Sequence, residues 1–574
     1  MKILLVHPQD HPQKWAAHKW DLIVDLGSAP ESTYAQWTRG FKCPAISFQK
    51  YCCLEEDLKF IRYISGKGAF LQDAEGIHWW DLFVLFFSDQ MQLIASVCRF
   101  AKSLTRDDQV FITRPCMEAD LLQRLQPCSV RLLSGPSLRR GFLHYASELR
   151  ALPFWELRQI FWDKYDAGFT FRRHFAKKRD RSNTDVILLP SAYVNATKTA
   201  MTFASKLPNL DFLLVTTRAS GRMGSPARNV MTADLAGYAC KADSAEEYRQ
   251  ILQMWQDLRG ELALDPKTSP AVSLGLWESF PRFVKRGLKI RDAWLGVLKS
   301  EPVKGVLCCD NNPYTLLPVL LAKRRNIATV SCHHGALDWR YRIVSTYADT
   351  IIAKSEMERD YFSRVCGVPG NQIRSGAFIQ GAKTPEIRAA CATDAIVFFS
   401  EPYESHKARA IEIYEQVLPP LADIAIKEGR ELIVKLHPFE NTRRRKTLVR
   451  KTLSTEQLRV TKIMAGPLTR ELLEQTWFGV TLLSTVAMEC AALGIPCFMC
   501  QWLEYPHHEY GDQFRRFGIG HSLKSTAELL TIPSVIRGQI EDRRIPLSIG
   551  ASLSMSEMER LFSSQDCSVL PAAI

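Results

Sequence analysis

Short apolar runs alternate with stretches of helical periodicity along most of the chain. In the last third, apolar runs bounded by glycine, proline or polar clusters predict strands at 395–403, 431–438, 458–466, 477–485 and 495–500. The segments between them repeat their apolar residues every three or four positions, which is typical of amphipathic helices. Strands and helices that alternate in this way predict a parallel sheet with helices on both faces.

A second block with the same alternation precedes the last third. Its predicted strands lie at 185–191, 210–217, 305–311, 328–335 and 349–355. Each block has about the usual size of a doubly wound nucleotide-binding domain. We therefore expect two Rossmann-like domains that face a cleft.

The first 150 residues follow the pattern less regularly, with candidate strands at 2–7, 21–27, 82–88, 109–114 and 129–135. The third candidate belongs to the most apolar stretch of the chain, which we interpret as a buried strand followed by a helix. Aspartate and glutamine side chains interrupt this stretch, so it is too broken to span a bilayer.

The length of 574 residues predicts more than one hydrophobic core. We expect an α/β protein with an N-terminal α/β domain of unassigned role at 1–150 and a basic aromatic bridge at 151–184. The two Rossmann-like domains follow at 185–380 and 390–560, and a tail at 561–574 ends the chain.

Composition and charge narrow the function classes. Hydrophobic residues make up 46% of the chain and charged residues 24%, as in an ordinary globular protein. The formal net charge of +13 favours anionic partners such as nucleotides or a phospholipid surface. The sequence contains no recognisable nucleic-acid module, so nucleic acid is not an expected partner. Cysteines without zinc spacing, and a start unlike a signal peptide, favour the cytoplasm.

The predicted bridge interleaves aromatic and cationic residues between positions 154 and 181. This composition suits the surface of an anionic bilayer, so peripheral attachment at the inner face of the plasma membrane is one expectation. A core helix with a basic exposed side is the alternative. A second basic run, at 443–446, is interpreted as a solvated helix face.

Polar residues end three successive predicted strands of the last block: Ser400-Glu401, His437-Pro438 and Ser484-Thr485. In a parallel sheet the carboxyl ends of the strands line the ligand crevice. An imidazole, hydroxyl groups and the free N–H groups of a helix start suit the phosphate of a nucleotide. A helix N-cap at Ser484 or Thr485 and a strand cap at His437 are the structural alternatives.

Two further residues extend this candidate phosphate site. Lys435 lies two positions before His437, so its side chain is expected on the same face of the strand. Glu489 lies one turn into the next predicted helix, where it can accept hydrogen bonds from ribose hydroxyls. A solvated helix position is the alternative for Glu489.

The segments "IVKLHP" and "LLSTVAMECAALGIPCF" resemble the donor half of GT-B glycosyltransferases. The resemblance is closest to the cell-envelope group: CDP-glycerol glycerophosphotransferases, bacterial sialyl- and polysialyltransferases, and capsule Kdo transferases. It implies that His437, Pro438, Ser484 and Thr485 hold a cytidine nucleotide. Glu489 matches a glutamate that also occurs in UDP-sugar GT-B enzymes.

The middle block resembles the end of a GT-B acceptor domain in "STYADTIIAKSEMERDYFSRVCGVPG". Its "SCHHGALD" resembles the glycerophosphotransferase "QHG" segment, with His333 in place of glutamine. The resemblance makes His334 the candidate general base, because an imidazole titrates near working pH. A structural histidine is the alternative, and Asp310, Asp338 and Glu401 are further candidate bases. The segment "CCDNNPY" supplies Asp310 without the glycine of the sialyltransferase acidic motif.

Together these features imply a glycosyltransferase of surface polysaccharide or capsule biosynthesis. It would transfer a sugar from a nucleotide-activated donor to a glycan or lipid-linked acceptor. No cofactor and no metal are expected, since no DxD motif follows a predicted strand. The alternatives are a CDP-glycerol-type polyol-phosphate transferase, a non-hydrolysing sugar-nucleotide epimerase and a non-catalytic GT-B scaffold.

Overall fold

The computed structural model describes residues 1–8, 10, 19–28, 38–39, 41–114, 116–125, 128–133, 169, 184–218, 227–239, 244–335, 337, 339–344, 347–376, 394–403, 408–504, 509–542 and 554–562. Its strands form three sheets whose strand pairs are all parallel. The predicted α/β class with doubly wound sheets is therefore confirmed. The predicted membrane-binding bridge at 154–181 lies outside the described residues, apart from the buried Phe169.

The C-terminal unit has the sheet order β15-β14-β13-β16-β17-β18, the 3-2-1-4-5-6 order of a Rossmann sheet. Its strands are β13 (Ala395–Phe399), β14 (Leu432–Lys435), β15 (Thr461–Met464), β16 (Thr476–Thr481), β17 (Cys497–Cys500) and β18 (His521–Leu523). Strands β13, β14, β16 and β17 are buried along their whole length, because helices cover both faces. This burial explains why they are continuous apolar runs.

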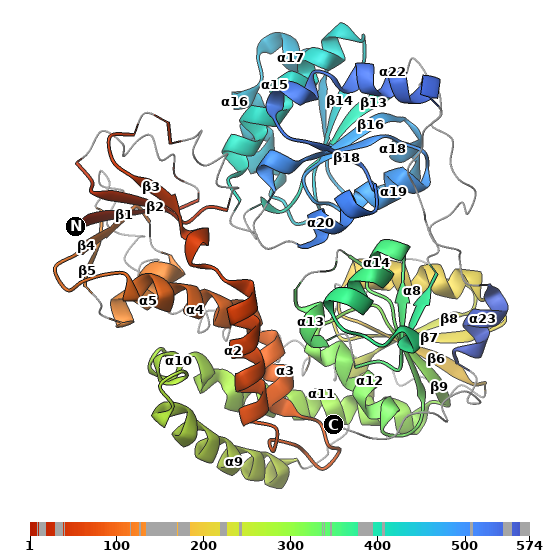
Figure 1. Ribbon diagram of the computed structural model, residues 1–574. Coiled ribbons are helices and arrows are strands. Elements are labelled where there is room, and N and C mark those ends of the chain that lie inside the picture. Colours follow the sequence, from red (N-terminus) through yellow and green to blue (C-terminus); the bar gives the residue numbers. More distant parts are fainter. Residues whose placement is uncertain are drawn as a thin grey trace.

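The helices of the C-terminal unit lie on both sides of its sheet (Figure 1). They are α15 (Ala410–Lys427), α16 (Thr442–Thr452), α17 (Thr455–Arg459), α18 (Arg470–Glu474), α19 (Val486–Ala492), α20 (Glu509–Arg516), α21 (Thr526–Leu529) and α22 (Ile532–Asp542). The strand order reverses between β13 and β16, which is where a doubly wound sheet opens its ligand crevice.

The middle unit has the order β12-β11-β10-β9-β6-β7-β8, again that of a Rossmann sheet with one strand added. Its strands are β6 (Val186–Ser191), β7 (Asp211–Thr216), β8 (Val230–Asp234), β9 (Val303–Cys308), β10 (Ala328–Ser331), β11 (Thr350–Ala353) and β12 (Ile373–Ser375). Its helices are α8 (Val194–Lys206), α9 (Ala245–Leu264), α10 (Ser269–Ser273), α11 (Phe280–Ser300), α12 (Pro313–Lys323), α13 (Tyr341–Val344) and α14 (Glu356–Asp360).

The N-terminal unit is a third sheet, of order β3-β2-β1-β4-β5. Its strands are β1 (Lys2–Val6), β2 (Leu22–Asp25), β3 (Ala45–Ser47), β4 (Gln109–Ile112) and β5 (Ser129–Leu132). Its helices are α2 (Leu54–Lys67), α3 (Trp79–Phe86), α4 (Ser88–Lys102) and α5 (Met117–Leu125). This sheet begins with the same order as the other two, so the chain contains three Rossmann-type units.

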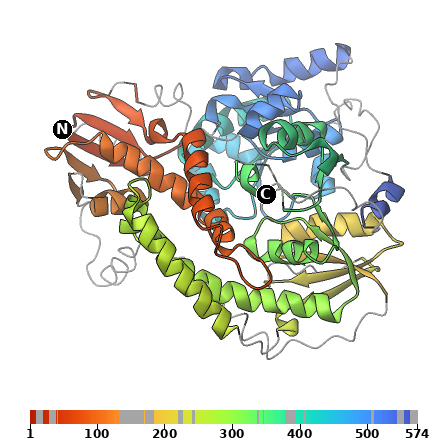
Figure 2. The ribbon, with the colours of Figure 1, turned by 60° about the horizontal axis from the view of Figure 1, so that its bottom comes forward.

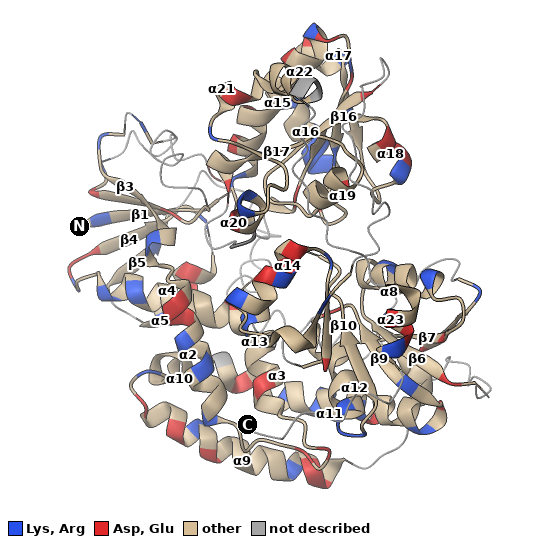
Figure 3. Cartoon of the chain, turned by 45° about the vertical axis from the view of Figure 1, so that its right-hand side comes forward, with Lys and Arg blue, Asp and Glu red and all other residues tan. Residues whose placement is uncertain are grey.

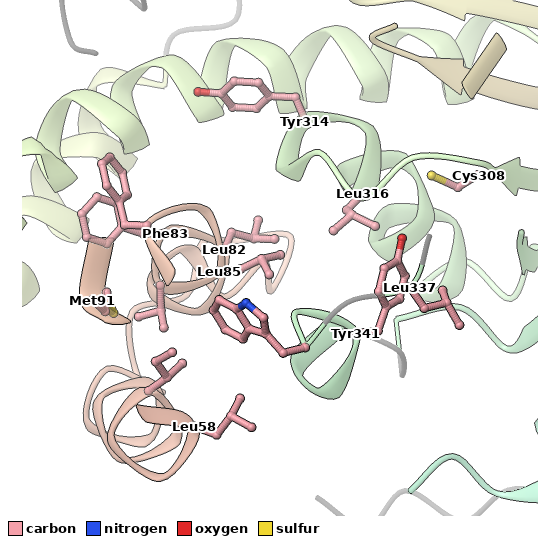
Figure 4. Packing of buried hydrophobic residues seen from close by; sticks show 14 of the residues in the cluster. Leu58, Leu82, Phe83, Leu85, Met91, Cys308, Tyr314, Leu316, Leu337 and Tyr341 are labelled. Atoms are coloured by element: carbon pink, nitrogen blue, oxygen red, sulfur yellow. The ribbon is translucent and has the colours of Figure 1, made fainter. Parts of the chain in front are cut away.

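The strand predicted at 82–88 is wrong, because this segment forms most of α3. Helix α3 lies between the N-terminal and middle units, and six of its eight residues are buried apolar side chains. Trp80 packs against Trp255 and Phe280 of the middle unit, with ring centroids 5.4 and 5.3 Å apart. Figure 4 shows Leu82, Phe83 and Leu85 of α3 beside Tyr314 and Leu316 of α12. A helix buried on every side lacks amphipathic periodicity and reads like a buried strand.

The last described helix falls within the predicted C-terminal range of 390–560 but packs on the middle unit. Helix α23 (Met555–Arg560) brings Met558 and Phe562 into the core around Ile187 and Leu189. Phe562 also fills the space above Gly305, where an added Cβ would lie 2.5 Å from the ring. Because residue 305 in β9 is a glycine, Phe562 can pack directly against this strand.

Within the described part of the chain, no single helix is long and apolar enough to cross a membrane. Helices α3 and α4 pass the same test only as a pair, and they are bent against each other by 63°. Most of their large apolar residues, among them Trp79 and Phe83, are buried in the core.

The middle and C-terminal units face each other with the carboxyl ends of their strands (Figure 1). Tyr193 follows β6 and Phe439 follows β14, and their ring centroids lie 5.8 Å apart. An ion pair of 2.8 Å joins Arg516 of α20 to Asp360 of α14. Figure 3 shows these two charged helices opposite one another between the units.

Candidate functional site

His334 lies just beyond β10, at the carboxyl edge of the middle sheet. Its Nδ1 is 2.8 Å from the carbonyl oxygen of Cys309. A carbonyl oxygen can only accept, so in the neutral ring Nδ1 carries the hydrogen and Nε2 is the acceptor atom. The backbone at the end of β9 thereby fixes the tautomer that a general base needs at Nε2.

The surroundings of His334 favour its neutral form. Burial lowers the pKa of His334, and Lys354 acts in the same direction. Asp310 and the Cys309 carbonyl oppose this shift of the pKa, but burial is the largest effect. A neutral imidazole near pH 7 is the state that can accept a proton.

The neighbouring histidine faces other partners. The His333 ring lies 4.6 Å from the Tyr341 ring and lines a small cavity of about 40 Å³ together with Ser331 and Tyr347. The His334 ring instead lies 4.9 Å from the Tyr193 ring. The two histidines therefore have different environments, although their own ring centroids are only 4.5 Å apart.

His437 holds the opposite tautomer on the facing edge. The backbone N–H of Phe439 donates to its Nδ1 at 3.2 Å, so in the neutral ring Nε2 carries the hydrogen. This arrangement makes Nε2–H of His437 a donor, as the binding of an anionic oxygen requires. The turn includes Pro438, which is exposed at the surface.

A buried carboxylate builds this turn. Glu440 accepts from the backbone N–H of His437 at 2.8 Å through one oxygen. Its other oxygen accepts from Ser400 at 2.9 Å and from the Arg445 guanidinium at 2.6 Å. Ser400 follows β13, so Glu440 links the ends of β13 and β14. Its hydrogen bond to the His437 N–H also holds the backbone of that residue in place. The basic run at 443–446 is thus not wholly solvated as predicted: Arg445 is buried, because its charge neutralises Glu440.

An aromatic contact joins the two histidines across the units. The Phe439 ring lies 5.1 Å from His437 and 5.8 Å from Tyr193, which in turn contacts His334. Phe439 remains 66% exposed despite this contact. We call the group of Tyr193, His334, Lys354, His437 and Phe439 the interdomain site.

Cations of the middle unit act on a carboxylate of the C-terminal unit. Glu489 of α19 keeps an exposed side chain, yet the protein on either side displaces water around it and raises its pKa. Lys354 and Lys198 oppose this shift of the pKa by attracting the carboxylate. Glu489 therefore lies within electrostatic reach of two lysines that follow β11 and β6.

Lys354 is held in place by its own unit. Its ammonium group donates to the Gly335 carbonyl at 3.1 Å and lies 3.2 Å from Glu358. Burial is the largest single effect and disfavours the charged form, but Glu358 and other nearby groups, Glu489 among them, together outweigh it and raise the pKa of Lys354. The ammonium charge is therefore fixed beside His334.

Lys435 and Glu401 brace strand ends. The Lys435 ammonium is buried and donates to the carbonyls of Leu436 and Gly466 at 3.0 and 2.7 Å. Burial lowers the pKa of Lys435. One oxygen of Glu401 accepts from the N–H groups of Leu482 and Leu483 and from the Thr481 hydroxyl, at 3.0, 2.8 and 2.9 Å. Glu401 thus ties β13 to β16 at the reversal of strand order.

The remaining candidates have smaller roles in the geometry. Ser484 accepts from the Val486 N–H at 3.3 Å through its hydroxyl, and Thr485 precedes α19. Asp310 accepts from the Asn312 N–H at 3.2 Å. Its negative charge partly opposes the lowering of the pKa of His334. Asp338 lies outside the described residues. No cluster of three or more His, Cys, Asp or Glu among the described positions is placed to hold a metal ion.

Sequence reasoning missed Tyr193, Lys198, Lys354, Phe439 and Glu440. A local signal existed for Lys354, which directly follows an apolar strand, and for Glu440, three positions after His437. Tyr193 and Phe439 carry no local signal, because their contact joins positions 246 residues apart (439 − 193).

Searches against protein families and against curated proteins gave no match. Among solved structures, the UDP-GlcNAc 2-epimerase from Methanocaldococcus jannaschii is 12% identical with a TM-score of 0.41, covering 67% of this chain and 99% of its own. A putative UDP-N-acetylglucosamine 2-epimerase from Listeria monocytogenes is 9% identical with a TM-score of 0.42, covering 68% and 100%. A glycosyltransferase from Rickettsia africae is 10% identical with a TM-score of 0.37, covering 67% and 93%. Similarities at this level do not identify an activity.

Proposed function

We propose that this protein transfers a sugar from a nucleotide-activated donor to a hydroxyl group of a glycan or lipid-linked acceptor. The observation that carries the proposal is the pair of histidines on facing sheet edges. His334 has its acceptor atom at Nε2, and His437 has its donor at Nε2. One suits a proton acceptor and the other suits a ligand of phosphate, which are the two needs of such a transfer.

In the proposed step, Nε2 of His334 takes the proton of the acceptor hydroxyl. The acceptor oxygen forms a bond to the anomeric carbon of the sugar as the bond from that carbon to the phosphate oxygen breaks. The nucleotide leaves with the electron pair of the broken bond. His437 donates to the phosphate, and the charge of Lys354 offsets the negative charge that develops on it.

The donor is proposed to bind across β13, β14 and β16 of the C-terminal unit. His437 and the hydroxyls of Ser484 and Thr485 would face the phosphate, and Glu489 would accept from the ribose. The resemblance of these segments to cell-envelope enzymes favours a cytidine nucleotide. Fixed cations and N–H donors supply the charge stabilisation, so the proposed transfer uses no metal and no cofactor.

The role in surface polysaccharide assembly rests on the same resemblance. The net charge of +13 supports a phosphorylated or lipid-anchored acceptor at an anionic surface. In this proposal the protein acts in the cytoplasm, beside the inner face of the plasma membrane.

The test begins with melting of the full-length protein in the presence of CMP, CDP, UDP, GDP and ADP. A nucleotide that binds the native state raises the melting temperature by mass action. CMP-, CDP- or UDP-activated sugars are then supplied with and without a glycan acceptor. Nucleotide release that depends on the acceptor supports the transferase. Conversion of the sugar without an acceptor would show an epimerase, and no binding of any nucleotide would overturn the proposal.

A further inference from the structure

The N-terminal and C-terminal units share a buried ion pair. Asp25 ends β2, and Nη1 of Arg409 lies 3.0 and 3.2 Å from its two carboxylate oxygens. The side chains are 0% and 1% exposed, respectively. Arg409 also pairs with Glu412 at 2.6 Å and donates to the backbone carbonyl of Asp10. The pair joins positions 384 residues apart, so only the docking of the two units creates it.

Arg409 occupies a particular place in the N-terminal sheet. The end of the second strand of a Rossmann sheet, next to the first strand, is where an acidic residue ordinarily binds a ribose hydroxyl. Asp25 stands at this position, since β2 pairs with β1. Here the acid receives a guanidinium from another unit. Gly27 leaves room for it, because an added Cβ would lie 2.8 Å from Cγ of Arg409.

The same arginine ends the connection that leaves β13. Arg409 is the residue before α15, and Glu401 lies two residues beyond β13. At the start of this connection, Glu401 accepts hydrogen bonds from the residues that follow β16. At its end, Arg409 is paired with Asp25. Glu401 follows β13 and Arg409 directly precedes α15, so both anchors lie at the carboxyl edge of the C-terminal sheet, where the nucleotide is proposed to bind.

The N-terminal unit is itself fixed to the middle unit. Helices α9 and α11 of the middle unit extend under the N-terminal unit (Figure 2). Asp73 of the N-terminal unit pairs with Arg291 of α11 at 2.7 Å, and both side chains are buried. Asp25 therefore belongs to a unit that is tied by a buried ion pair to the unit carrying His334.

We propose that the N-terminal unit is a positioning module for the nucleotide crevice, with Arg409 as its positioning residue. In the N-terminal sheet, the end of β2 binds the Arg409 side chain in the place where a Rossmann sheet ordinarily binds ribose. We call this place, formed by Asp25 and Gly27, the socket. The socket fixes the α15 end of the β13–α15 connection relative to the middle unit. This inference rests on the proposed nucleotide binding and assigns a role to the first 150 residues.

The test uses the full-length chain and two variants of the socket. Asp25→Asn removes the charge that holds Arg409, and Gly27→Ala displaces the arginine while keeping both charges. The matched control is Glu75→Gln, which breaks a 2.8 Å pair with Arg325 between the N-terminal and middle units. Amide hydrogen exchange is measured in peptides covering 398–403 and 409–415. Affinity for CMP and UDP is measured by calorimetry, and KM and kcat are measured where a donor is turned over.

Both socket variants should speed exchange in these peptides and raise the Kd or KM for the nucleotide about tenfold, with kcat nearly unchanged. Glu75→Gln should change neither. Unchanged exchange in a folded socket variant overturns the positioning role. If Asp25→Asn does not fold, Gly27→Ala decides. If the native protein binds neither nucleotide, the proposed function fails, and the exchange measurement still decides whether the socket positions the connection.

Discussion

His334 and His437 hold opposite tautomers on the facing edges of two sheets. A backbone carbonyl fixes the hydrogen of His334 on Nδ1, and a backbone N–H fixes the hydrogen of His437 on Nε2. Each imidazole thus presents Nε2 in a different role. A general base needs an unprotonated Nε2, whereas a side chain that donates a hydrogen bond to phosphate needs a hydrogen on Nε2. Backbone groups of each unit fix these two states without a side chain from the other unit.

The first prediction concerns the base. His334→Ala should lower turnover by about 10²–10⁴-fold and leave nucleotide affinity nearly intact, because it removes only the proton acceptor. His333→Ala is the control, since that ring faces Tyr341 and should matter much less. Steady-state kinetics and calorimetry measure the two effects. Full turnover in His334→Ala, or greater damage in His333→Ala, would place the base elsewhere.

The second prediction concerns pH. Burial lowers the pKa of His334 from its usual 6.5, so the native ring stays neutral when the unfolded ring takes up a proton. The unfolded state then binds more protons as pH falls below 6.5, and this contribution destabilises the native state. The free energy of unfolding should therefore decline less steeply below pH 6.5 in His334→Ala than in the native protein, as measured by denaturation in urea. An equal slope in both proteins would contradict the neutral state.

The third prediction concerns phosphate binding. His437→Ala should weaken nucleotide binding by about 1–3 kcal/mol, because a hydrogen bond to a charged oxygen is lost. Calorimetry measures the affinity, and circular dichroism checks that the fold remains. An unchanged affinity in the folded variant would remove His437 from the site.

The fourth prediction concerns Glu440. Glu440→Ala leaves the buried guanidinium of Arg445 without its carboxylate, which should cost about 3–5 kcal/mol of stability. The control is Glu431→Ala, which breaks an exposed pair with Lys462 and should cost about 0–1 kcal/mol. Urea denaturation measures both. Similar losses in the two variants would show that burial does not set the importance of Glu440.

The fifth prediction concerns the aromatic contact between the units. A double-mutant cycle of Tyr193→Ala and Phe439→Ala should give a coupling of about 0.5–1.5 kcal/mol, because the rings touch across the interface. Tyr193→Phe keeps the ring and should keep most of the coupling. Strictly additive effects on the free energy of unfolding would mean that the units do not hold this contact in solution.

The sequence by itself determined the elements of the two Rossmann-like units. Strands such as β13, β14 and β16 are buried on both faces, so their residues are apolar without interruption. The polar residues at their ends are equally local, which is why His437 could be placed just beyond the end of a strand from the chain alone. The same reasoning failed at α3, because a helix buried between two units loses the polar face that would identify it.

Only the tertiary structure decided which residues meet. Tyr193 contacts Phe439, and Asp25 contacts Arg409, because separate units dock with particular faces together. Packing within the C-terminal unit decided that Glu440 and Arg445 are buried as a pair. Periodicity reports which face of an element avoids water, but it carries no information about which distant element covers that face. The strand ends were therefore readable from the sequence, whereas the partners that fix them were not.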